Sequence, residues 1–196
     1  MDSFALVFDQ FRTRIYNWRV AQNFVVKMTM AVGCAVVIGL AAHVKILTPL
    51  SPVAFSLSTA AVLLTAVLLG RHWGAVAVAI YVAMAVLGLP VMTASLGITF
   101  GYVVGFFAAA LLIGYLVDKV VKSRHFWPLF AVMVVSSVII LLGGSLWMWV
   151  WLGTQVSLLE IMRLAFVPFV ITDLLKSAAV AMIATTVLPK KTSLKS

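Results

Sequence analysis

The stretch 126–149, FWPLFAVMVVSSVIILLGGSLWMW, runs without a charged residue. A helix needs about 20 mostly apolar residues to cross the hydrocarbon core of a bilayer, and this stretch meets that length. Its apolar residues are continuous rather than alternating, which excludes the pattern of a membrane β-barrel strand. We therefore expect Phe126–Trp149 to form a membrane-spanning α-helix.

The rest of the chain has a similar composition. Of its 196 residues, 64% are hydrophobic and 10% are charged, and the mean hydropathy is +1.19. Ordinary globular domains are about 45–50% apolar and about 25% charged, so this composition excludes a soluble enzyme and a disordered chain. The one cysteine, Cys34, allows neither an internal disulfide nor a cysteine metal site.

Five further apolar stretches approach the length of a span, and turn residues and charges separate them. The six expected transmembrane helices are Phe24–Leu47, Phe55–Leu69, Ala75–Val91, Phe100–Val117, Phe126–Trp149 and Leu164–Leu188. We therefore expect an all-α membrane protein with one transmembrane domain, residues 23–190, followed by a basic tail, residues 191–196. A tight turn is predicted at 70–74, between the second and third stretches.

Residues 1–22 predict an amphipathic helix before the first span. Its apolar face comprises Phe4, Phe8, Phe11, Ile15 and Trp18, whereas Asp9, Arg12 and Arg19 lie elsewhere around the helix. Such a helix is expected to lie in the membrane interface. The alternative is that it docks a partner helix.

The charges predict the orientation of the chain. Lysine and arginine number 14 against 5 aspartate and glutamate residues, a net charge of +9. If all six stretches span, every cation except Lys45, Arg163 and Lys176 falls on one side. Cytoplasmic loops collect Lys and Arg, so we expect a multi-pass protein of the cell inner (plasma) membrane with both termini in the cytoplasm. The basic composition then reflects topology, and we expect contact with membrane lipids and no nucleic-acid partner.

Asp173 and Lys176 stand out because both fall inside an apolar stretch. Each costs about 2.5–3.5 kcal/mol at the centre of a spanning helix on insertion scales. Their spacing of three places them on one helical face. They predict a polar ligand site inside the bundle, open to the outside. The alternative is an ion pair that only locks helix packing.

Two further patterns involve small and hydroxyl-bearing residues. Ala31, Ala35 and Gly39 recur every four residues, which allows close helix approach, either within this bundle or to a partner membrane subunit. Gly97, Gly101 and Gly105 form a similar track that predicts close packing, with Tyr102 between them. Before this track, Thr93 and Ser95 could offer hydroxyl groups to a ligand.

The sequence lacks three common catalytic motifs. It contains no H-E-x-x-H zinc motif, no G-x-x-x-x-G-K-[ST] phosphate loop and no G-x-S-x-G elbow. A catalytic metal or a serine triad therefore has little support. Any role driven by ATP needs energy from another chain.

Several segments together resemble a known family. In chain order they are Ala31-x-x-x-Ala35, the loop with Pro49 and Pro52, Gly88-Leu89-Pro90-Val91, the run 97–106 (GITFGYVVGF), and Asp173-Leu174-Leu175-Lys176. This order is similar to that of BioY, the biotin-binding membrane component of energy-coupling-factor (ECF) vitamin transporters.

The resemblance implies both a function and a set of site residues. The chain would be an S component that is not an enzyme and carries no cofactor. It would capture biotin from outside and move it inward with a transmembrane coupling subunit and two ATPase subunits, which use the ATP. The implied ligand-binding residues are Asp173, Lys176, Tyr102, Ser58, Thr93 and Ser95, and the implied partner-docking residues are Ala31, Ala35 and Gly39.

Two departures from the family pattern keep other functions open. Ser56 and Ser58 stand where members usually carry Thr and Gln, and the glycine-rich insertion after Pro90 is short. A related cofactor acid such as lipoate is therefore an alternative ligand. Two alternatives come from other classes of function. One is an intramembrane enzyme that uses Asp173 and Lys176, and the other is a purely structural subunit.

Overall fold

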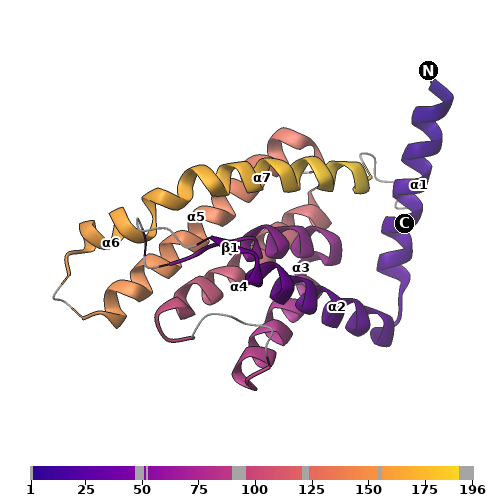
Figure 1. Ribbon diagram of the computed structural model, residues 1–196. Coiled ribbons are helices and arrows are strands. Elements are labelled where there is room, and N and C mark those ends of the chain that lie inside the picture. The colour runs from indigo at the N-terminus through magenta and orange to yellow at the C-terminus, as the bar shows by residue number, and fades with distance from the viewer. Residues whose placement is uncertain are drawn as a thin grey trace.

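The computed structural model describes residues 2–46, 51, 53–89, 96–120, 124–153 and 156–189. It is a helical bundle with two short antiparallel strands (Figure 1). The helices are α1 (Asp2–Ala21), α2 (Phe24–His43), α3 (Ser58–Val86), α4 (Leu96–Lys119), α5 (Phe126–Trp151), α6 (Leu158–Ala165) and α7 (Val167–Val187). The strands are β1 (Lys45–Ile46) and β2 (Phe55–Ser56). Thr93, Ser95 and the predicted tail 191–196 lie outside the described residues.

Four helices of the described chain are long and apolar enough to cross a membrane. They are α2, α3, α4 from Gly97 onward, and α5. The uncharged stretch 126–149 thus forms one continuous helix, α5, as predicted. The side chains of α5 are apolar almost all round, because some face the bundle core and others face outward.

The second and third predicted spans are two arms of α3, joined by a reversal at Gly70. Gly70 has φ +78° and ψ −176°, a conformation that residues with a Cβ rarely adopt. A Cβ added to Gly74 would lie 3.0 Å from Ala66 Cα, although residues eight apart in a straight helix are about 12 Å apart. The chain therefore folds back at Gly70, and the predicted turn is confirmed.

The glycine track packs α4 closely against α5. A Cβ added to Gly105 would lie 2.6 Å from Ile140 Cα, and one added to Gly143 would lie 3.0 Å from Gly101 O. Trp147 Nε1 also donates a hydrogen bond to Gly97 O, at 2.7 Å. The close packing predicted for this track is confirmed.

The last predicted stretch is broken in the structure. The sequence predicted a single helix from Leu164, whereas α6 ends at Ala165 and α7 begins at Val167. Ser157 caps the start of α6 by accepting a hydrogen bond from Glu160 N. Pro168 occupies the first turn of α7, where its missing N–H does no harm. The helix boundary was therefore wrong, because hydropathy continues smoothly across the break.

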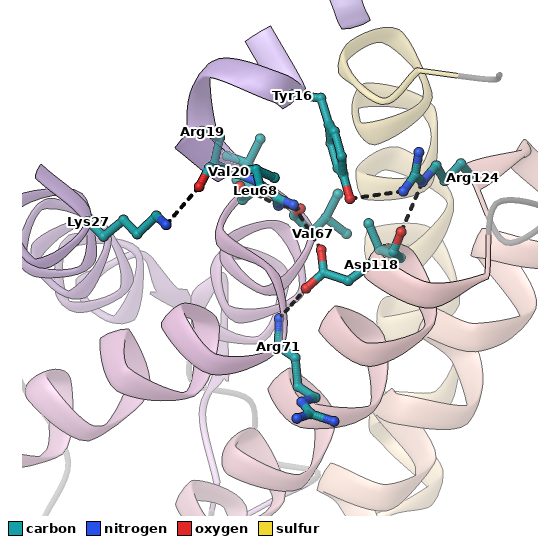
Figure 2. Close-up of polar contacts among 10 residues, drawn as sticks. Tyr16, Arg19, Val20, Lys27, Val67, Leu68, Arg71, Asp118 and Arg124 are labelled. Carbon is teal, nitrogen blue, oxygen red and sulfur yellow. Dashed lines mark hydrogen bonds and ion pairs between the residues drawn. The ribbon is translucent and has the colours of Figure 1, made fainter. Parts of the chain in front are cut away.

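Helix α1 stands at the end of the bundle opposite α6 (Figure 1). Arg19 Nη2 pairs with Asp118 Oδ1 of α4 at 2.8 Å. Arg124 is 1% exposed, and its guanidinium donates to Tyr16 Oη and Val117 O, both at 2.9 Å (Figure 2). These contacts hold the C-terminal half of α1 against the helix ends of the bundle.

The other face of α1 carries exposed apolar side chains. Phe11, Ile15 and Trp18 are 59%, 37% and 52% exposed, while the side chains of Phe4 and Phe8 lie outside the described part. This distribution agrees with the amphipathic helix expected for residues 1–22. Its position in a membrane interface stays a prediction.

Candidate functional site

A cavity lies where the C-terminal end of α2, the two strands and the N-terminal ends of α3, α4 and α7 meet α5. We call it the α7 cavity; its volume is about 130 Å³. It is lined by Ala42, Lys45, Val53, Ala54, Ser56, Ser58, Thr59, Tyr81, Thr99, Tyr102, Val103, Phe106, Ile140, Leu141, Phe169, Asp173 and Lys176.

Helix α7 places both of its charged residues on the cavity wall. Lys176 Nζ lies 2.9 Å from Asp173 Oδ1, as the spacing of three residues allows. The side chain of Asp173 is 4% exposed and that of Lys176 is 13% exposed. Each charge thus compensates the other, since an unpaired charge would be costly at this depth. A ligand in the cavity could contact either side chain.

Tyr102 is fixed in position by backbone contacts on two sides. Its hydroxyl donates a hydrogen bond to Ala165 O at the end of α6, at 3.0 Å. Its ring lies against Gly144 of α5, where an added Cβ would overlap the ring. Both contacts hold the ring at the wall of the α7 cavity.

The strand pair supplies further polar groups. In β1 and β2, Lys45 lies opposite Ser56, and the Ser56 Oγ and Ser58 Oγ atoms are 2.6 Å apart. Lys45 is an exposed second cation at the cavity. The strands therefore add hydroxyl groups and a positive charge to the pair on α7.

Aromatic and aliphatic side chains form the rest of the wall. Phe169 of α7 stacks on Phe55 of β2, with ring centroids 4.4 Å apart and an interplanar angle of 27°. Tyr81, Phe106 and Ile140 are buried beside the cavity. An apolar wall with a few convergent polar groups is typical of a small-molecule site.

Four of the residues predicted to bind a ligand come together here. Asp173, Lys176, Tyr102 and Ser58 all line the α7 cavity, although they come from α3, α4 and α7. Thr93 and Ser95 lie outside the described residues. That any of these residues contacts a ligand stays a prediction.

The sequence reasoning missed Lys45, Tyr81 and Phe169 as cavity residues. Lys45 could have been identified from the sequence, because only it, Arg163 and Lys176 do not fall on the basic side of the predicted topology. Hydropathy does not single out Tyr81 and Phe169, since each lies in an apolar stretch that resembles ordinary core.

The arrangement suits a small molecule that carries both polar and acidic groups. Asp173 accepts hydrogen bonds, Lys176 and Lys45 donate them, and the hydroxyl groups can do either. Within the described ranges, no group of His, Cys, Asp and Glu side chains could hold a metal ion. The cavity therefore offers binding groups for a small molecule.

The small-residue stripe of α2 faces the interior of the bundle. Ala31 and Ala35 have no exposed surface, and Gly39 is buried. Ala31 packs with Leu69 and Ala77 of α3. The stripe thus packs within this chain, and the role of Ala31, Ala35 and Gly39 in docking a partner subunit stays a prediction.

Comparison with known proteins gives a family match over most of the chain. The family model described as the BioY family matches residues 13–192. The biotin transporter BioY of Thermotoga maritima is 35% identical over 144 residues, which cover 69% of this chain and 81% of that protein. The probable biotin transporter BioY of Lysinibacillus sphaericus is 30% identical over 175 residues, which cover 83% of this chain and 87% of that protein.

The fold is also similar to a solved structure. The crystal structure of the S-component for biotin from an ECF-type ABC transporter matches with a TM-score of 0.70 and 22% sequence identity. The match covers 84% of this chain and 93% of the other. The prediction of an all-α membrane protein is confirmed by this likeness of fold.

Proposed function

Because this chain belongs to the BioY family, we propose that the α7 cavity holds biotin and that the chain is the substrate-capture component of a vitamin transporter. As a member of a transporter family, the chain is not an enzyme. Asp173 and Lys176 therefore serve binding, and no covalent chemistry is assigned to them.

The Asp173–Lys176 pair at the cavity wall is the observation that carries this proposal. Biotin offers ureido N–H groups, a ureido carbonyl, a carboxylate and an apolar ring system. The Asp173 carboxylate can accept from the ureido N–H groups, and the ammonium groups of Lys176 and Lys45 can bind the carboxylate or the carbonyl. The ring of Phe169 and the side chain of Ile140 offer an apolar surface to the rest of the molecule.

Biotin enters from outside the cell in this proposal. The cavity lies beside Lys45, at the end of the bundle away from most lysine and arginine residues. The positive-inside rule places the more basic end in the cytoplasm. Residues 23–190 then form the six-span binding domain, residues 1–22 lie in the membrane interface, and residues 191–196 and both termini lie in the cytoplasm.

Inward movement needs a source of energy that this sequence lacks. The chain carries no phosphate-binding loop. The solved structure with the same fold is an S-component of an ECF-type ABC transporter. We therefore assign the chain three partners, a transmembrane coupling subunit and two ATPase subunits that use the ATP.

Equilibrium binding of radiolabelled biotin to the purified chain in detergent tests the ligand. We expect saturable binding to one site, displaced by unlabelled biotin but not by the same concentration of lipoate. Equal displacement by lipoate would show that the site binds a broader class of cofactor acids. No saturable binding of biotin would contradict the proposal.

A further inference from the structure

A second cavity lies at the opposite end of the bundle. It is formed by the C-terminal end of α1, the N-terminal end of α2, the reversal in α3 and the C-terminal end of α4. We call it the basic pocket; its volume is about 430 Å³. Its lysine and arginine residues are Arg19, Lys27, Arg71 and Lys119, and the acidic residue on its wall is Asp118.

Asp118 is already neutralised by groups of the chain itself. One carboxylate oxygen pairs with Arg19 Nη2 at 2.8 Å, and the other accepts a hydrogen bond from Arg71 N at 3.0 Å. The Arg71 side chain points away from this carboxylate (Figure 2). The negative charge of Asp118 is therefore matched by Arg19 alone, and the other three cations are left without an acid.

Lys27, Arg71 and Lys119 together make the pocket positively charged. Lys27 Nζ donates to the carbonyl oxygen of Val20 at 2.9 Å, and Arg71 Nη2 lies 2.9 Å from His72 Nε2. In the described ranges, none of Lys27, Arg71 and Lys119 forms an ion pair with a carboxylate. Three uncompensated positive charges around one cavity attract an anion.

The wall of the pocket is apolar where α2 meets the reversal in α3. Met30, Leu69 and Trp73 line it, and Phe24 packs edge-on against Trp73 with centroids 5.5 Å apart. Phe24 and Val25 are 66% and 68% exposed. Cations therefore sit directly beside an exposed apolar helix face, and a phospholipid matches both with its headgroup and its acyl chains.

The position of the pocket agrees with this ligand. On α4, Tyr102 and Phe106 line the α7 cavity, whereas Tyr115 and Lys119 line the basic pocket. The basic pocket thus lies at the ends of spanning helices, where headgroups lie and where tryptophan is enriched. Basic pockets between transmembrane helices bind anionic headgroups at this level.

We propose that the basic pocket binds the phosphate headgroup of an anionic phospholipid, with the acyl chains along the exposed face of α2. Arg71, Lys119 and Lys27 contact the phosphate. An acidic segment of a partner protein would pair with the cations. It would not account for the exposed apolar face of α2 beside them.

Native mass spectrometry of the chain released from nanodiscs of equal parts phosphatidylglycerol and phosphatidylcholine tests the proposal. We expect the wild-type chain to retain phosphatidylglycerol preferentially. Replacing Arg71 and Lys119 with Gln should lower that preference roughly 30-fold, since each basic residue near the surface contributes about fivefold. Both side chains have solvent-accessible surface, so the double variant should fold.

The matched control removes two positive charges outside the basic pocket. Arg14→Gln with Arg163→Gln alters exposed cations outside the pocket and should keep the preference, as should the charge-retaining variant Arg71→Lys with Lys119→Arg. No preference in the wild-type chain, or an equal loss in the control, would overturn the proposal. Displacement of phosphatidylglycerol by millimolar inorganic phosphate would also overturn it, because the pocket would then bind free phosphate.

Discussion

Lys176 Nζ lies 2.9 Å from Asp173 Oδ1, one turn further along α7, and both side chains are largely buried at the wall of the α7 cavity. This pair has two consequences that can be separated. It neutralises two charges inside the bundle, and it presents an acceptor and a donor to the cavity. Variants that remove both charges together keep the interior neutral, so they test ligand binding separately from charge compensation.

Lys176→Met should destabilise the protein, because it leaves the Asp173 carboxylate buried without its partner. Breaking a buried pair in this way costs about 3–5 kcal/mol. The double variant Asp173→Asn with Lys176→Met carries no buried charge and should recover most of that loss. Thermal unfolding in detergent measures both effects. A single variant as stable as the wild type would show that the pair does not compensate a buried charge.

Gly70→Ala should destabilise the reversal in α3. The backbone at Gly70 has φ +78°, and an added Cβ would meet the Asp118 carboxylate. Such strain costs roughly 1–3 kcal/mol, or a fall of roughly 2–12 °C in the thermal midpoint for a chain of this size. The control is Gly33→Ala on α2, where an added Cβ meets nothing within 4 Å. The control should be neutral or stabilising, and equal effects of the two changes would contradict this account of the turn.

Gly144→Ala should weaken biotin binding. The new methyl group would occupy space now held by the Tyr102 ring, which must then shift within the α7 cavity. Binding of radiolabelled biotin measures the loss, and Gly33→Ala again serves as the control. Unchanged affinity in Gly144→Ala would show that the position of Tyr102 does not matter for the ligand.

Ala35→Trp should lower the thermal stability of the isolated chain. Ala35 has no exposed surface, whereas Val37, two residues further on, is 55% exposed. A tryptophan at position 35 overpacks the core, which typically costs 1–3 kcal/mol or more, and Val37→Trp should leave stability nearly unchanged. If Ala35→Trp folded normally and instead lost the coupling subunit on copurification, the stripe would be a docking surface after all.

The sequence predicts most of the architecture, because membrane helices follow simple rules. Apolar runs locate the helices, and the glycine at position 70 marks the reversal that the structure confirms. Asp173 and Lys176 were identifiable as a pair since two charges in an apolar stretch need partners. Their placement on one cavity wall agrees with the helical spacing.

The remaining features depend on contacts between distant segments. Lys45 reaches the cavity because β1 pairs with β2, a contact of two-residue strands that periodicity does not reveal. The stripe of Ala31 and Ala35 marks a close helix contact, but the same spacing serves an internal or an external neighbour. The break between α6 and α7 lies within continuous apolar sequence, so hydropathy could not locate it.

Biotin affinity of the neutral double variant tests the central claim, that the Asp173–Lys176 pair binds the ligand. Isothermal titration of biotin into the purified wild-type chain should give saturable binding to one site. The variant Asp173→Asn with Lys176→Met should remain folded but bind at least roughly 100-fold more weakly, since it loses charge-assisted hydrogen bonds of about 1.5–3 kcal/mol each. Asp9→Asn, on α1 outside the α7 cavity, should bind as the wild type does. Wild-type affinity in the folded double variant would contradict the claim and leave the pair a packing contact alone.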